Sequence, residues 1–220
     1  MAFLPTLFFD LDGTLVDSEP GIVNGIAHVF EALRQPVPPR EALRAWIGPP
    51  MRDSFQAAFG DETRVTQALA LYRQRYDTLG WTELTVYPGI PELIEALAQA
   101  GHRLAVVTSK NERAARRILG ALPFGAAFEE IVGASDDGTR RFKPDLIAEA
   151  LARLQGQAGE CVMIGDRRMD IEGAAAHAMR SIGVLWGFGE RDELRAAGAG
   201  QVVGTPSALA DVLGVVLPRG

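Results

Sequence analysis

A short apolar run that ends in two acidic residues is the feature that most constrains the fold of this chain. Phe8-Phe9 is followed by Asp10-Leu11-Asp12 and then by Gly13-Thr14. Such a run is typical of a buried strand, and open α/β sheets bind ligands at the carboxyl ends of their strands. Residues two positions apart on an extended strand point the same way, so Asp10 and Asp12 would repel each other. The sequence therefore predicts a divalent cation at this strand end, with one carboxylate left for attack and the other for proton transfer.

After Asp17 the pattern changes from strand to helix and stays helical for about sixty residues. Ser18 and Pro20 predict a helix start. Apolar residues then recur at helical spacing, at Ile22, Ile26, Val29, Phe30 and Leu33. Further helices are expected over residues 41–46, 54–59 and 63–79. The sequence thus predicts an all-helical cap domain, without strands of its own, over residues 18–83.

An alternation of strands and helices begins at Val86 and continues to the end of the chain. Strands are expected over residues 103–108, 130–133, 162–164, 181–185 and 201–203. Helices are expected over residues 91–100, 111–120, 145–154, 170–178 and 190–197. Such an alternation implies right-handed βαβ units and a parallel sheet covered on both faces. We therefore expect an α/β fold, a doubly wound parallel sheet formed by residues 1–17 and 84–220, which the cap interrupts after the first strand.

Composition and charge exclude several classes of protein. The chain has 220 residues, a net charge of −6 from 22 basic and 28 acidic residues, and no segment that concentrates Lys and Arg. This balance argues against nucleic-acid and membrane-surface partners. The single cysteine, Cys161, is expected to be a buried hydrophobic residue, and the scattered histidines form no zinc motif. Because we find no leader-like or membrane-spanning pattern, the expected location is the cytoplasm.

Later residues add polar groups at the expected ends of other strands. Thr108-Ser109-Lys110 ends one apolar strand with two hydroxyls and a lysine, which suit phosphoryl oxygens, although such hydroxyls also cap helices. Lys143 precedes a helix start, and taken alone it is typical of a solvated surface lysine. Gly165-Asp166 repeats the strand-then-acid pattern, and Asp170 follows one helical turn later. These two acids can face a single cation.

Taken together, these residues resemble the haloacid dehalogenase-like (HAD) hydrolases, in the phosphoglycolate phosphatase-like branch that carries an all-helical cap. Asp10-Leu11-Asp12-Gly13-Thr14 is similar to the first motif of that family, Thr108 to the second, Lys143 to the third, and the run from Gly165 to Asp170 to the fourth. The resemblance spans nearly the whole chain. It implies a Rossmann-like core that acts on a small phosphorylated metabolite.

The resemblance also implies roles for the matching acids. Asp10 would be the nucleophile that forms an aspartyl-phosphate, and Asp12 would protonate the leaving oxygen and then activate water. Mg²⁺ would be held by Asp10, by the main-chain carbonyl of Asp12 and by Asp166. Asp170 would assist directly or through a water molecule.

Other positions would contact the substrate. Thr108 and Lys143 would bind the phosphoryl oxygens together with Ser109, which stands where the branch often has asparagine. Arg52 lies in a turn that resembles the branch's specificity loop, and it would either bind the substrate or be an exposed arginine at a helix start. Arg167 stands where a small hydroxyl residue is frequent, and it would either bind a second anionic group or pair with an acid of the cap.

Four aromatic residues of the expected cap, Trp46, Phe55, Phe59 and Trp81, favour a hydrophobic core over an aromatic ligand site. Asp17 would lie at the hinge of the cap, where capping of the next helix explains it nearly as well.

The implied activity is that of a magnesium-dependent phosphatase of small phosphomonoesters. The branch favours 2-phosphoglycolate, with nucleoside 5'-monophosphates or sugar phosphates as alternatives. A phosphomutase is disfavoured because such relatives usually carry Glu-Asp in place of Gly165-Asp166, and a dehalogenase because its chemistry needs no acid at Asp12. A non-catalytic phospho-acceptor module would have no use for a cap that excludes water. We expect a monomer or a homodimer.

Overall fold

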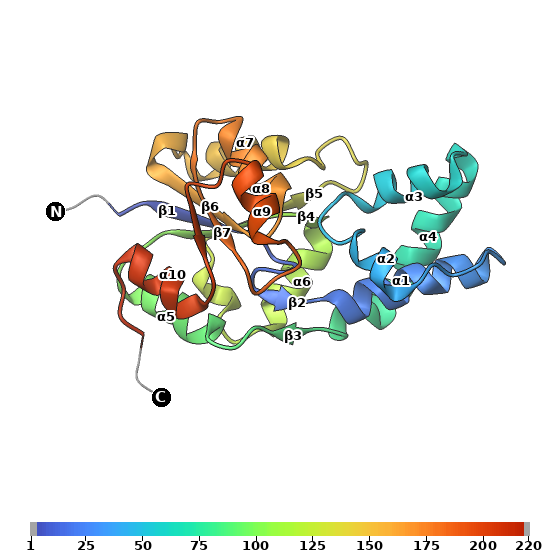
Figure 1. Cartoon of the computed structure of the whole chain (residues 1–220), viewed down its shortest axis with the longest axis horizontal. Helices are drawn as coiled ribbons and strands as arrows, with labels where there is room; N and C mark the ends of the chain where they lie inside the picture. Colours follow the sequence, from blue (N-terminus) through green and yellow to red (C-terminus); the bar gives the residue numbers. More distant parts are fainter. Residues whose placement is uncertain (1–3, 218–220) are drawn as a thin grey trace. The chain divides into compact units, whose positions relative to one another are not determined.

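A six-stranded parallel sheet forms the centre of the larger part of the chain (Figure 1). The computed structural model describes residues 4–217. The strands lie in the order β5-β4-β1-β6-β7-β8. Their bounds are β1 Thr6–Phe9, β4 Leu104–Asn111, β5 Glu130–Ala134, β6 Cys161–Gly165, β7 Arg180–Val184 and β8 Gln201–Val203. All neighbours pair in parallel, which confirms the expected doubly wound α/β fold.

Strand β1 lies between β4 and β6, where the order of strands along the chain reverses. In open α/β sheets, ligands bind outside the carboxyl ends of the strands at such a reversal. All four residues of β1 are buried, because helices cover both faces of the sheet. This burial explains why β1 is a continuous apolar run and not an alternating one. Because β1 ends at Phe9, the next residue, Asp10, lies at the carboxyl edge of the sheet.

Helices α7 and α8 lie on one side of the sheet, and α5 and α10 lie on the other (Figure 1). The helices of this part are α5 Ile90–Gln99, α6 Glu112–Ala121, α7 Lys143–Leu154, α8 Arg168–Ala175, α9 Arg191–Ala196 and α10 Pro206–Leu213, with 3₁₀ turns η2 Gly125–Ala127 and η3 Ala158–Glu160. Phe8 and Met163, which are register partners, pack with Leu146 of α7 in a buried core. Cys161 lies in the same core, and burial raises the pKa of its thiol, as expected of a structural cysteine.

Residues 17–85 form a separate compact unit that is helical. Its elements are α1 Glu19–Ala32, α2 Arg40–Arg44, α3 Met51–Phe59, α4 Glu62–Thr78 and the 3₁₀ turn η1 Gly80–Thr82. The buried ring of Phe55 lies 5.4 Å from Trp46 and 5.9 Å from Phe59, centroid to centroid, so these residues pack as a hydrophobic core. Trp81 lies half-buried in η1. The backbone amide of Glu19 donates to Asp17 Oδ1 at 3.0 Å, which supports the capping explanation for Asp17.

Two short strands at the boundary, β2 Val16–Asp17 and β3 Thr85–Val86, form a two-stranded sheet that the sequence pattern did not predict. Within the described residues, the elements inside 18–83 are all helical, as expected. The compact units divide at residues 17 and 85. The assignment of residues 1–17 and 84–220 as a catalytic core, and of 18–83 as its cap, stays a prediction.

Several element bounds differ from the sequence expectation for local reasons. Strand β4 runs on to Asn111, whose side chain accepts from the amide of Ala114 and so caps α6. Helix α7 begins at Lys143, two residues earlier than expected, because Pro144 suits the first turn of a helix. Helix α8 covers residues 168–175 in place of 170–178. Over residues 4–217, none of the helices combines the length and apolar character that a membrane span requires.

Candidate active site

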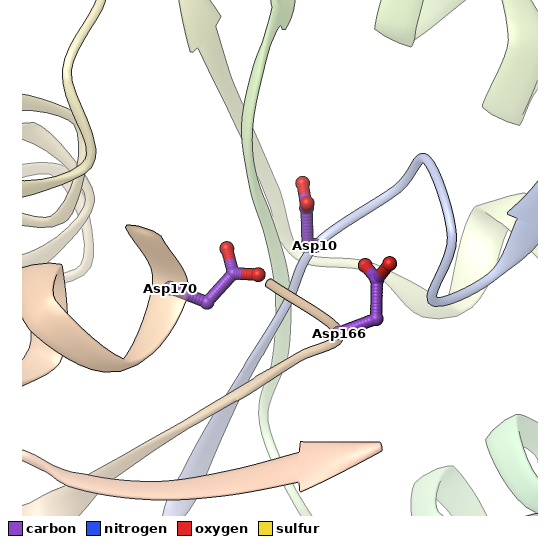
Figure 2. Close-up of side chains that lie close together, drawn as sticks. All are labelled: Asp10, Asp166 and Asp170. Atoms are coloured by element: carbon purple, nitrogen blue, oxygen red, sulfur yellow. The ribbon is translucent and has the colours of Figure 1, made fainter. Parts of the chain in front are cut away.

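Three buried aspartates converge at the carboxyl edge of the sheet. Asp10 follows β1, Asp166 follows β6, and Asp170 lies in the first turn of α8. Each offers a carboxylate oxygen, and these atoms lie within 4.8 Å of one another. Figure 2 shows the three side chains coming from separate segments and approaching a common space. The structure therefore brings together the three carboxylates that the sequence assigned to a metal.

Two glycines allow these acids to come so close. Gly13 has a φ of +84°, and a Cβ atom there would collide with the carboxylate of Asp166. A Cβ atom at Gly165 would collide with the carboxyl group of Asp170. Only a residue without a side chain fits at these two positions, which explains the glycines that follow Asp12 and precede Asp166.

Neutral donors hold both oxygens of Asp166. The hydroxyl of Thr14 donates to Oδ1 at 3.2 Å, and the backbone amide of Phe188 donates to Oδ2 at 2.8 Å. The indole of Trp186 in turn donates to the carbonyl oxygen of Thr14 at 3.0 Å. Sequence reasoning assigned no role to Trp186 or Phe188. Their position just after β7, at the same sheet edge as Asp10, is the signal that could have identified them.

Lys143 bridges two of the three aspartates. Its Nζ lies 2.9 Å from Asp10 Oδ1 and 2.6 Å from Asp170 Oδ1, and it donates to the carbonyl oxygen of Val107 at 2.7 Å. Burial lowers the pKa of this ammonium, but the charges of Asp10 and Asp170 outweigh that effect and raise the pKa above its usual value. Lys143 is therefore a buried residue of the site and not the solvated surface lysine that it resembles in isolation.

The three carboxylates are short of positive charge. Burial raises the pKa of Asp166 well above its ordinary value, and the neighbouring Asp170 and Asp10 raise it further. Burial likewise raises the pKa of Asp170 to about 6, with Lys143 opposing and Asp10 adding to the effect. Closely spaced, desolvated carboxylate oxygens are the donor set that a hard divalent cation prefers, so these residues fit a metal ion.

Asp12 follows β1, and Thr108 and Ser109 lie near the carboxyl end of the neighbouring strand β4. The carboxylate of Asp12 pairs with Lys110, whose Nζ lies 3.0 Å from Asp12 Oδ2. Thr108 is buried and its hydroxyl accepts from the backbone amide of Lys110 at 3.2 Å, while Ser109 is half-buried. Among the described residues, the converging carboxylates are those of Asp10, Asp166 and Asp170, so a role for Asp12 through its main-chain carbonyl stays a prediction.

The two arginines singled out in the sequence have acidic partners. Arg167 Nε lies 3.0 Å from Glu193, a residue of α9 in the α/β unit, so this ion pair does not involve an acid of the expected cap. The backbone amide of Arg167 also donates to Asp170 Oδ2 at 3.0 Å. Arg52, in α3, pairs with Glu62 at 2.7 Å, and both side chains are exposed. Substrate binding by Arg52 stays a prediction.

Comparison with known proteins places these residues in a family context. Residues 7–184 match the haloacid dehalogenase-like hydrolase family. The chain is 42% identical over 186 residues to the tyrosine-protein kinase PtkA of Mycobacterium tuberculosis. The aligned residues make up 84% of this chain and 64% of PtkA, so this chain spans just under two thirds of the length of PtkA. It is also 42% identical over 193 residues to a 5'-nucleotidase of Pseudomonas aeruginosa, with 87% of each chain covered.

A solved structure agrees with the sequence comparison. The crystal structure of a predicted phosphatase from Clostridium acetobutylicum superposes with a TM-score of 0.91 at 35% identity, covering 96% of this chain and 98% of that one. The matched range, residues 7–184, contains Asp10, Thr108, Lys143, Asp166 and Asp170. Since both the fold and the sequence match over most of the chain, it belongs to the haloacid dehalogenase-like hydrolase family.

Proposed function

We propose that this protein is a magnesium-dependent phosphoric monoester hydrolase that acts through an aspartyl-phosphate on Asp10. The observation that supports this most strongly is the buried cluster of Asp10, Asp166 and Asp170 with Lys143 bridging two of its members. Phosphoryl transfer depends mainly on positioning and on compensation of negative charge, and this cluster is built for both.

Asp10, Asp166 and Asp170 would hold Mg²⁺, together with the main-chain carbonyl of Asp12. When bound, Mg²⁺ supplies the positive charge that lets an anionic phosphoryl group approach buried carboxylates. Thr14 and the amide of Phe188 orient Asp166 for this purpose, since they donate to its two oxygens.

In the proposed reaction, a carboxylate oxygen of Asp10 attacks phosphorus, and the bond from phosphorus to the substrate's alcohol oxygen breaks. Asp12, in its protonated form, gives its proton to that leaving oxygen. It then removes a proton from the water that attacks the aspartyl-phosphate, so that inorganic phosphate leaves, Asp10 is restored as a carboxylate and Asp12 is restored as a protonated acid. Thr108, Ser109 and Lys143 would bind the phosphoryl oxygens during both steps.

Small phosphorylated metabolites are the proposed substrates. Similarity to a 5'-nucleotidase over 87% of each chain supports nucleoside 5'-monophosphates as the first class to test. The resemblance to the phosphoglycolate phosphatase-like branch keeps 2-phosphoglycolate and sugar phosphates as alternatives. Similarity to a tyrosine-protein kinase supports transfer to a protein acceptor as a second candidate, which a phosphatase assay distinguishes because only hydrolysis releases inorganic phosphate. A cytoplasmic location and a monomeric or dimeric state stay expectations.

Phosphate release provides the test. The protein is incubated with p-nitrophenyl phosphate, nucleoside 5'-monophosphates, 2-phosphoglycolate and sugar phosphates, with Mg²⁺ or with excess chelator. We expect hydrolysis that chelation abolishes. Asp10→Asn should reduce hydrolysis to background with an unchanged circular dichroism spectrum, because an amide is a poor nucleophile. Full activity in chelator would contradict the metal requirement, and turnover by Asp10→Asn would contradict the assigned nucleophile.

A further inference from the structure

The sequence contains only two lysines, Lys110 and Lys143, among its 22 basic residues. Their side chains are 7% and 2% exposed, and each pairs with an aspartate of the Asp10-Leu11-Asp12 segment. Arginines in the described ion pairs are more exposed, with side chains from 14% to 56% exposed. Both lysines therefore lie at the proposed active site, and the other basic residues counted here are arginines. A compact ammonium fits a confined site better than a planar guanidinium does.

Lys110 reaches Asp12 from the neighbouring strand. Phe9 of β1 is the register partner of Val106 of β4, and the regular pairing of β4 shifts after Val107. Asp12 and Lys110 lie just beyond these strand positions. The amide of Lys110 donates to the hydroxyl of Thr108, which orders the backbone there, and the ammonium lies 3.0 Å from Asp12 Oδ2.

The two lysines contact different carboxylates of the site. Lys143 contacts Asp10 and Asp170, and Lys110 contacts Asp12. A carboxylate that ligates the cation is poorly suited to proton transfer, so Asp12 must be kept apart from the three converging acids.

We propose that Lys110 is a positioning residue that holds the carboxylate of Asp12 aside from the cluster of Asp10, Asp166 and Asp170, ready for proton exchange with the substrate's leaving oxygen. This inference rests on the proposed phosphatase function. It assigns to Lys110 a role that differs from direct binding of the phosphoryl group, because Lys110 acts through Asp12.

Leaving-group dependence tests the inference. Lys110→Met keeps the length of the side chain and removes its charge. We expect kcat/KM to fall about 10- to 100-fold for an alkyl ester such as glycerol phosphate, the range for loss of a hydrogen bond to a charged group, and by less than about 3-fold for p-nitrophenyl phosphate, whose leaving oxygen needs little protonation. Asp12→Asn should show the same selectivity. The double variant should be no worse than Asp12→Asn alone, because both residues act as one unit.

Arg103→Met is the matched control, since it removes the exposed Arg103–Glu129 ion pair just before β4 and should leave both rates unchanged. Equal losses for both esters in Lys110→Met, or no loss, would overturn the inference while leaving the phosphatase proposal intact. Wild-type protein that releases phosphate from none of these esters, and from none of the nucleoside monophosphates, 2-phosphoglycolate and sugar phosphates named above, would refute the phosphatase function and this inference with it.

Because the chain has only two lysines, nuclear magnetic resonance can test the contact between Lys110 and Asp12 without an activity assay. Protein labelled with ¹³C at lysine Cε should give two lysine side-chain signals, and Lys143→Arg identifies the one that belongs to Lys110. Asp12→Asn should shift the Lys110 signal because its charged partner is lost. An unmoved Lys110 signal would overturn the inference even if Lys110→Met did not fold.

Discussion

Replacing Lys143 by methionine tests how the buried carboxylates are balanced. Lys143 Nζ lies 2.9 Å from Asp10 Oδ1 and 2.6 Å from Asp170 Oδ1, and its side chain is 2% exposed. Methionine has a similar length and no charge. In Lys143→Met, Asp10 and Asp170 would therefore stay buried beside Asp166 without the ammonium that now pairs with them.

The expected cost is large. Removing one partner of a buried ion pair costs about 3–5 kcal/mol, because the remaining charge is left uncompensated. In a chain of this size each kcal/mol lowers Tm by about 2–4 °C, so Tm should fall by about 6–20 °C in the metal-free protein. Excess Mg²⁺ should restore part of this loss, because the cation compensates the same carboxylates. Asp10→Asn in the Lys143→Met background should also restore part of it.

Calorimetry at about pH 8, where Asp170 is ionised, measures the effect in chelator and in excess Mg²⁺. Arg103→Met serves as a control, because its exposed ion pair contributes at most about 1 kcal/mol. A fall in Tm of less than about 2 °C in chelator would refute the reasoning. A loss of the same size with and without Mg²⁺ would show that Lys143 and the metal do not share these carboxylates.

Two further predictions concern the acids of the site. Because burial raises the pKa of Asp170 to about 6, folding favours its protonated form, so its contribution to the stability of the metal-free protein is greatest below about pH 4 and is lost as pH rises through 6. The difference in Tm between wild type and Asp170→Asn should follow this window in chelator, and a constant difference would contradict it. Trp186→Phe removes the indole donor to Thr14, whose hydroxyl holds Asp166, and should weaken Mg²⁺ binding about 10-fold. Titration calorimetry measures this, and unchanged affinity would show that Trp186 does not support the site.

The fold was largely predictable from local patterns. The apolar run before Asp10 and the alternation of strands and helices after Val86 each reflect the environment of consecutive residues, and they lead to the observed parallel sheet. Element ends were less predictable. The two-stranded sheet of β2 and β3 depends on backbone pairing, and the start of α7 at Lys143 depends on Pro144 in its first turn, and hydrophobic periodicity encodes neither.

The candidate site likewise has features that the sequence predicts and features that depend on the folded structure. The sequence by itself determined which acids stand at strand ends, because Asp10 and Asp166 follow apolar runs that must be buried. The tertiary structure alone decided which partner each acid has. The contact of Thr14 with Asp166 spans 152 positions and that of Trp186 with Thr14 spans 172, and such pairings arise only when parallel strands set distant segments side by side. Because a side chain's partner is chosen by packing in space and not by neighbours in the chain, the pairing of Lys110 with Asp12 became visible only in the folded protein.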